Sequence, residues 1–133
     1  MKRIFTTFFL VFFTATTQAE IVVIGNLNGI ESLSFTQVEK IFMGRSYALP
    51  NGQVANPVDQ STLRTEFYEK LTSKPIEQIN AYWAQIVFKG LNFLPLLSDD
   101  KEVLTIINSN KNTIGYIDKK NVNNRVRVLL ILN

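Results

Sequence analysis

The feature that most constrains the fold is a continuous apolar run, EIVVIGN at residues 20–26. It contains four consecutive β-branched residues, Ile21 to Ile24. This is typical of a strand buried on both faces, because a strand with one wet face alternates apolar and polar side chains. Gly25 and Asn26 close the run and begin a loop. The run therefore predicts a strand that is covered on both sides.

Four later segments have the apolar spacing of amphipathic helices. In residues 32–44, Ser34 and Gln37 are spaced as a capping box, and Gly44 supplies the stop. The other three helices are expected over residues 61–71, 73–90 and 98–110.

Further strands are expected over residues 54–59, 112–117 and 125–132. The resulting order, βα–βαα–αβ–β, predicts an α/β domain with about four helices. The loop LNFLPLL at residues 91–97 is too apolar to be fully exposed, so we expect it to pack on the domain. No repeat, low-complexity segment or internal linker divides the sequence.

The N-terminus has the parts of a secretory signal peptide. Two basic residues precede an apolar stretch, and Thr17 and Ala19 stand at the minus-three and minus-one positions of a cleavage site. A membrane anchor is the weaker alternative, because the apolar stretch is shorter than the roughly 20 residues that span a bilayer. We therefore predict a leader at residues 1–19, a domain at residues 20–133, and no stable membrane anchor after cleavage.

The charge of the mature chain argues against nucleic-acid binding. Removing residues 1–19 takes away two of the 14 Lys and Arg side chains and none of the 11 acidic ones, which leaves a net charge of +1. A chain this balanced has no evident basic stripe for a phosphate backbone. The sequence has no Cys, so the fold relies on its core, and a lipoprotein anchor is excluded.

The residue types also argue against an enzyme. Without His or Cys, the usual general base, thiol nucleophile and zinc ligands are missing. Asp99 and Asp100 form the only adjacent acidic pair, and a helix start explains them better than catalysis. No phosphate-binding or dinucleotide-binding glycine loop is present, so we predict no catalytic residues, no metal and no cofactor.

One cluster of polar residues has the chemistry of an anion site. It stands between a strand and a helix and consists of Asp59, Gln60, Ser61, Thr62 and Arg64. A helix start offers unpaired N–H groups, and the Ser61 and Thr62 hydroxyls add further donors. Arg64 leans back toward the helix N-terminus, where its guanidinium could bind an oxyanion. The alternative is structural: Asp59 or Ser61 caps the helix, and Arg64 pairs with Asp59.

Two other features have simpler interpretations. Trp83 shares a helix face with Ile79 and other apolar residues, which predicts a core position rather than a sugar-stacking platform. Arg125 and Arg127 alternate with valines in the last strand, which predicts a half-exposed sheet edge.

Three segments, in the same order, resemble phosphate-binding proteins of ABC transporters. LSFTQVEKIFMGR at residues 33–45 is similar to the family segment Leu-Thr-x-x-Gln-(Leu/Val)-x-x-Ile-Phe-x-Gly-Lys. PVDQSTLRTEFYEKL resembles the family's strand, Ser/Thr-rich turn and helix, and VLTIINSNKNTIGYI resembles its return into the sheet. The resemblance implies one α/β lobe of a type-2 periplasmic binding protein, with a mixed sheet flanked by about four helices.

The resemblance is incomplete at the turn. Asp59 and Ser61 match the family's Asp and Ser, whereas Gln60, Thr62 and Leu63 stand where the family prefers Gly, Gly and Thr. The family's arginine before the turn is missing, and Arg64 is its candidate substitute. Full-length members also have a second lobe that closes on the ligand.

The resemblance implies a periplasmic domain that binds inorganic phosphate or a similar oxyanion, with a membrane transporter or another periplasmic protein as a candidate partner. Asp59 would accept the proton of monohydrogen phosphate. The expected site residues are Asp59, Gln60, Ser61, Thr62 and Arg64, with Asn26 and Asn28 completing the shell. The alternative is a periplasmic interaction domain that kept the fold, lost ligand binding, and docks through its last strand or the 91–97 loop.

Overall fold

The computed structural model describes residues 6–7, 10 and 19–133, so most of the predicted leader lies outside the described residues. The helices are α1 (Phe35–Phe42), α2 (Arg64–Thr72), α3 (Ile76–Phe88), α4 (Asp100–Ser109) and a short 3-10 helix, η1 (Lys119–Asn121). The strands are β1 (Ile21–Asn26), β2 (Asn56–Pro57), β3 (Asp59–Gln60), β4 (Leu96–Leu97), β5 (Thr113–Asp118) and β6 (Val126–Leu132). Within this part of the chain, no helix is both long and apolar enough to cross a membrane.

The main sheet is mixed, with strand order β2-β5-β1-β6. β1 is antiparallel to both β5 and β6, whereas β2 is parallel to β5. The prediction of an α/β domain with a mixed sheet and four helices is confirmed, and β6 is an edge strand as expected. The expected strand over residues 54–59 instead divides into β2 and β3, and β3 pairs with β4 in a separate two-stranded sheet.

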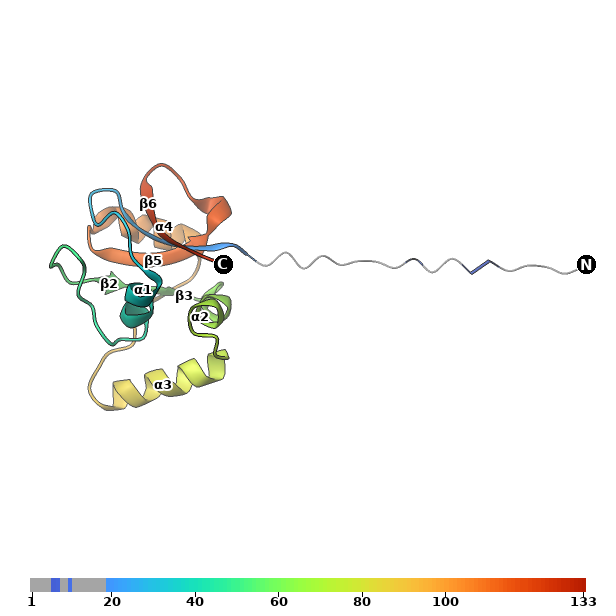
Figure 1. Cartoon of the computed structure of the whole chain (residues 1–133), viewed down its shortest axis with the longest axis horizontal. Helices are drawn as coiled ribbons and strands as arrows, with labels where there is room; N and C mark the ends of the chain where they lie inside the picture. Colours follow the sequence, from blue (N-terminus) through green and yellow to red (C-terminus); the bar gives the residue numbers. More distant parts are fainter. Residues whose placement is uncertain (1–5, 8–9, 11–18) are drawn as a thin grey trace, which may run out of the picture.

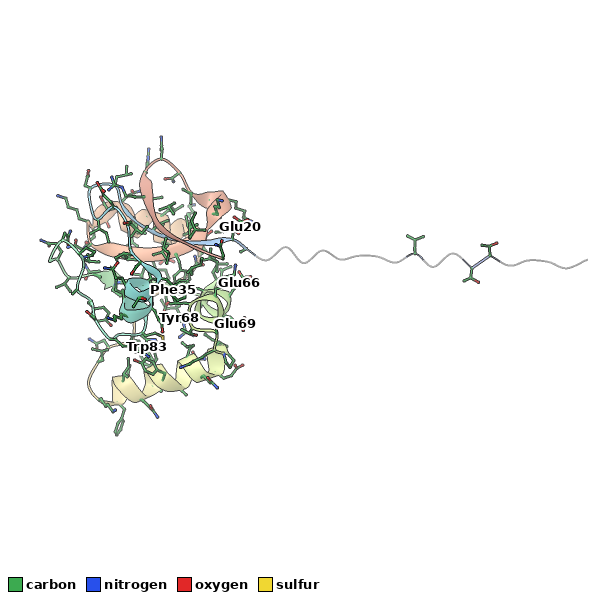
Figure 2. All side chains as sticks on the ribbon, viewed as in Figure 1. Glu20, Phe35, Glu66, Tyr68, Glu69 and Trp83 are labelled. Atoms are coloured by element: carbon green, nitrogen blue, oxygen red, sulfur yellow. The ribbon has the colours of Figure 1, made fainter. Side chains whose placement is uncertain are left out.

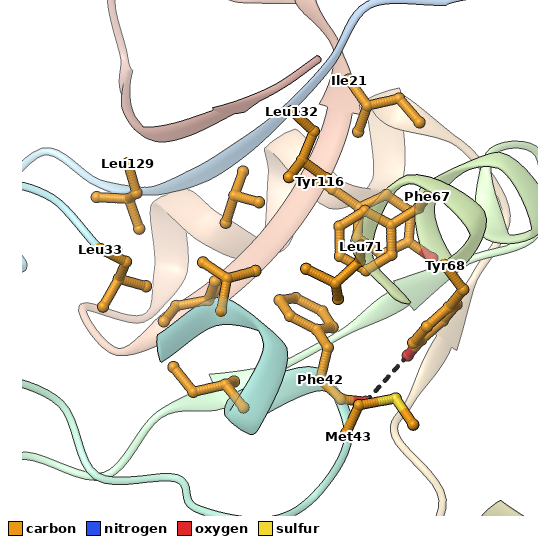
Figure 3. Close-up of a cluster of buried hydrophobic side chains, with 14 of the residues drawn as sticks. Ile21, Leu33, Phe42, Met43, Phe67, Tyr68, Leu71, Tyr116, Leu129 and Leu132 are labelled. Atoms are coloured by element: carbon orange, nitrogen blue, oxygen red, sulfur yellow. Dashed lines mark hydrogen bonds between the residues drawn. The ribbon is translucent and has the colours of Figure 1, made fainter. Parts of the chain in front are cut away.

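β1 is buried on both faces, as its apolar run predicts. Residues 21–24 have no exposed surface, and their side chains alternate between two hydrophobic cores. α4 covers one face with Val103 and Ile107, while α1 and α2 cover the other. Figure 1 shows these helices on the two sides of the sheet, with α3 outermost beside α1 and α2. Figure 3 shows the larger core, in which Phe67 stacks on Tyr116.

Local signals in the sequence fix the ends of α1 and the position of α3. Ser34 and Gln37 form the predicted capping box, with backbone-to-side-chain distances of 3.1 and 2.8 Å. Gly44 has φ +67°, and a Cβ there would lie 3.0 Å from the indole of Trp83. A larger residue would therefore push against Trp83, which is buried in the core as predicted.

The 91–97 segment packs on the domain through Leu91 and Leu94, but Phe93 and Leu96 remain exposed. Its backbone holds the polar turn in place. The Asp59 N–H donates to the carbonyl of Pro95 at 2.8 Å, and the Ser61 N–H donates to that of Leu97 at 2.9 Å. The turn that carries the candidate site is thus fastened to β4 as well as to the main sheet.

Candidate functional site

Asp59 is the buried centre of the cluster. Only 5% of the residue is exposed, because β3 carries it between α2 and β5. The Tyr68 hydroxyl donates to the carboxylate at 2.9 Å, and the Tyr116 hydroxyl donates to Oδ1 at 3.0 Å. Arg64 Nε lies 3.7 Å from Oδ2. These groups occupy the carboxylate, so Asp59 is poorly placed to receive a proton from a ligand in solvent.

Burial raises the pKa of Asp59, because it disfavours the charged carboxylate. The hydroxyls of Tyr68 and Tyr116, together with Arg64, oppose this shift by stabilising the charge. The same burial raises the pKa of both tyrosines, and the neighbouring carboxylate raises them further. Both hydroxyls therefore keep their protons and act as donors to Asp59.

Gln60 is also buried and fixes the turn to two other elements. Its side-chain Nε2 donates to Asp100 Oδ1 at 2.6 Å, at the start of α4, and to the Tyr116 carbonyl of β5 at 2.9 Å. Its backbone N–H donates to the Tyr116 hydroxyl at 3.2 Å. Gln60 thus supports the turn from behind, and its side chain does not reach solvent.

Ser61 and Thr62 are exposed at the start of α2. The Ser61 hydroxyl lies 3.4 Å from the Leu97 carbonyl, and the Thr62 hydroxyl donates to the Ser98 carbonyl at 3.1 Å. The first distance is long for a hydroxyl hydrogen bond, so the Ser61 hydroxyl can turn to another acceptor at little cost.

The capping alternative for Asp59 and Ser61 is wrong, since the residue at the N-cap is Leu63 and no side chain caps α2. α1 and α4, in contrast, are capped by Ser34 and Asp99. The first-turn N–H groups of α2 therefore lack a side-chain acceptor and face the exposed turn. This is the arrangement in which a helix start attracts anions.

Arg64 points away from this turn. Its Nη1 donates to Asn80 Oδ1 on α3 at 2.6 Å, and its guanidinium lies 5.2 Å from the centre of the Tyr68 ring. Thr62 lines a pocket between α2, α4 and η1, whereas Arg64 lines a different pocket against α3. The expected pairing of Arg64 with Asp59 is present, and the expected position of Arg64 beside the Ser/Thr donors is not.

Asn26 and Asn28 lie elsewhere. Asn26 Nδ2 donates to the carbonyl of Ile107 near the C-terminal end of α4, and Asn26 Oδ1 accepts from the Asn28 N–H. Thr62, in contrast, contacts Ser98 just before the N-terminal end of that helix. The expected completion of the site by Asn26 and Asn28 is thus not what the geometry gives, because α4 separates the two loops.

The charges around the turn limit what it can bind. The pocket beside Thr62 has a volume of about 340 Å³ and is lined by three aspartates and two lysines, Asp99, Asp100, Asp118, Lys101 and Lys120. Asp100 already accepts hydrogen bonds from Gln60, Asn121 and the Asp118 N–H. Among the described residues, no group of three or more acidic, His or Cys side chains could hold a metal ion.

Sequence reasoning missed three residues of this cluster. Tyr68 and Tyr116 hold Asp59, and Asn80 turns Arg64 toward α3. Tyr116 follows Gly115 in an apolar strand, and a buried tyrosine normally needs a partner for its hydroxyl. That signal indicates a buried acceptor, but it does not identify Asp59.

Comparison with protein-family models and with curated proteins gives no match. Two solved structures are similar. One is described as a phosphate ABC transporter substrate-binding protein with bound phosphate from Clostridium perfringens, with a TM-score of 0.65 and 18% identity. The other is an ABC-type phosphate transport receptor from Vibrio cholerae, with a TM-score of 0.65 and 14% identity.

The fold is that of one periplasmic-binding-protein lobe. Each comparison covers 84% of this chain but only 44% or 45% of the neighbour. The chain therefore spans less than half the length of these neighbours, and at this identity the likeness concerns the fold alone. The predicted fold class is confirmed, and the resemblance to phosphate-binding proteins is supported at the level of structure.

Proposed function

We propose that this domain binds phosphate-type oxyanions at the exposed start of α2, in the periplasm, and that it acts by binding rather than by catalysis. The observation that carries the proposal is the uncapped first turn of α2 beside two exposed hydroxyl residues, Ser61 and Thr62. The fold likeness to a structure described with bound phosphate supports it. The proposed donors are the first-turn N–H groups of α2 and the hydroxyls of Ser61 and Thr62.

The other expected site residues have supporting roles in this proposal. Asp59 and Gln60 anchor the turn to β5 and α4, and Arg64 balances the charge of Asp59. The anion is therefore bound from one side only and keeps much of its hydration. Three or four charge-assisted hydrogen bonds, less the cost of association, then correspond to a Kd of roughly 0.1 to several mM.

The proposal is tested by calorimetric titration of the mature domain with phosphate. Thr62→Val removes one donor and should weaken binding by about tenfold, the lower end of the 1.5–3 kcal/mol expected for a hydrogen bond to a charged group. Thr105→Val is the matched control, since Thr105 is an exposed threonine on α4. Sulfate should bind about as well as phosphate, because Asp59 is buried and does not sense the ligand's proton. Equal affinities of Thr62→Val and wild type would refute the role of the turn.

A second candidate function, a periplasmic interaction domain, is favoured by a different observation. A groove of about 610 Å³ runs along β2 and is lined mainly by apolar side chains, including exposed Val54 and Phe93. Pro57 lacks the N–H that strand addition would use, so a partner would bind this groove through side chains. A photo-reactive residue at position 93 should then cross-link one periplasmic protein in cells, whereas one at the equally exposed Phe88 should not. No cross-link at position 93 would remove this candidate.

A further inference from the structure

A second pocket lies on the other side of α2, between α2, α3 and the 91–97 segment. It has a volume of about 200 Å³ and is lined by Asp59, Arg64, Trp83, Phe93, Leu94 and Leu96. Neither Ser61 nor Thr62 lines it. Figure 2 shows Trp83 between α3 and the rest of the domain, so the indole forms an inner wall.

This pocket has more hydrogen-bond donors than acceptors. Arg64 carries five N–H groups, of which one faces Asp59 and one donates to Asn80. Its other N–H groups have no acceptor among the described residues. Trp83 Nε1 is also buried without an acceptor in this part of the chain, although only 2% of the residue is exposed. A buried indole N–H normally has a partner.

The remaining walls are apolar, and the one carboxylate is already occupied. Phe93, Leu94 and Leu96 supply the apolar side, and Phe93 and Leu96 are exposed where the pocket opens. The oxygens of Asp59 face Tyr68, Tyr116 and Arg64. A ligand that supplies acceptors at one end and a hydrocarbon chain at the other matches this arrangement. A single negative charge suits it better than the double charge of phosphate, because Asp59 is close by.

We propose that this pocket binds a small monocarboxylate with a short apolar chain. The carboxylate accepts from the free edge of the Arg64 guanidinium and from Trp83 Nε1, and the chain lies against Phe93, Leu94 and Leu96. At about 30 Å³ for each water-sized group, the pocket holds roughly six or seven such groups. This matches a five-carbon acid and is smaller than the sites of drug-sized ligands.

The sequence itself provides the reporter, because Trp83 is its only tryptophan. Titration of the mature domain with pentanoate should change the tryptophan emission and saturate. Pentanamide has the same shape without the charge, and it should bind at least about tenfold more weakly, equivalent to 1.4 kcal/mol. An equal response to the amide, or no saturable change at about 50 mM pentanoate, would overturn the proposal.

Variants assign the effect to the pocket. Phe93→Ala removes an exposed wall and should weaken pentanoate binding by about fivefold or more, and Arg64→Met should remove the preference for pentanoate over pentanamide. Phe88→Ala is the matched control, since Phe88 is 93% exposed and lies outside the pocket. If Arg64→Met does not fold, Phe93→Ala with Leu96→Ala decides. Unchanged affinity in that pair would refute the site.

This inference does not depend on the oxyanion site. Phosphate binding should shift the backbone amides at the start of α2 and leave the tryptophan emission unchanged, whereas pentanoate should change the emission. Failure of one titration therefore leaves the other proposal intact.

Discussion

The most informative substitution for the buried cluster is Tyr116→Phe. The Tyr116 hydroxyl donates to Asp59 at 3.0 Å and accepts from the Gln60 N–H at 3.2 Å. Its ring is stacked on Phe67, with centroids 3.6 Å apart and planes inclined by 5°. Phenylalanine preserves the ring, so the substitution removes the two hydrogen bonds with little change in packing.

The expected cost follows from these two bonds. A hydrogen bond to a charged group contributes about 1.5–3 kcal/mol, and a buried N–H left without a partner costs about 1–3 kcal/mol. Asp59 keeps its bond from Tyr68 and its contact with Arg64. We therefore expect the free energy of unfolding to fall by about 2–4 kcal/mol, less than the full sum.

Tyr82→Phe is the matched control. The Tyr82 hydroxyl is part-buried and donates to the Met43 carbonyl at 2.7 Å, a neutral hydrogen bond that contributes about 0.5–1.5 kcal/mol. Urea unfolding of both variants at neutral pH, followed by circular dichroism, gives the comparison. A cost for Tyr116→Phe no greater than that for Tyr82→Phe would refute the view that Asp59 is a charged and tightly held centre.

Three further predictions concern Asp59, β5 and Asn26. Burial raises the pKa of Asp59 in the folded protein above its unfolded value of about 3.9, so its contribution to stability is largest below that value and declines as pH rises through the folded pKa. The stability of wild type relative to Asp59→Asn should therefore decrease with pH in urea titrations, by at most about 1.4 kcal/mol per pH unit, and an increase would show that the hydrogen bonds outweigh burial. Gly115→Ala should reduce the free energy of unfolding by about 1–3 kcal/mol, because its Cβ would lie 2.6 Å from Val103 Cγ1, and an unchanged urea midpoint would contradict this packing. Asn26→Ala should reduce stability by about 0.5–1.5 kcal/mol through loss of its bond to Ile107, with phosphate affinity unchanged in calorimetry, and weakened phosphate binding would return Asn26 to the site.

The sequence predicts the elements that depend on local patterns. The doubly buried run of β1 and the capping box of α1 are visible in short windows, because burial and capping follow from neighbouring residues. The division of residues 54–59 into β2 and β3 could not be predicted in this way. β3 exists because Leu96 and Leu97 reach it from a distant loop, and no local pattern records that contact.

The candidate site was predicted only in part for the same reason. Ser61 and Thr62 lie at an exposed helix start, as a Ser/Thr-rich turn before a helix suggests. The direction of Arg64 depends on Asn80 and the burial of Asp59 on Tyr116, which are 16 and 57 residues away. Such long-range pairings decide which donors share a pocket.

The central claim, oxyanion binding at the start of α2, is tested most directly by phosphate titration of the labelled mature domain, followed through backbone amide shifts. The largest shifts should occur at Thr62, Leu63 and Arg64 and should saturate at millimolar phosphate. α3 also begins without a side-chain cap, so its first turn is an internal control for a general helix-end effect. Flat shifts at tens of millimolar phosphate, or equal shifts at the starts of α2 and α3, would contradict the account.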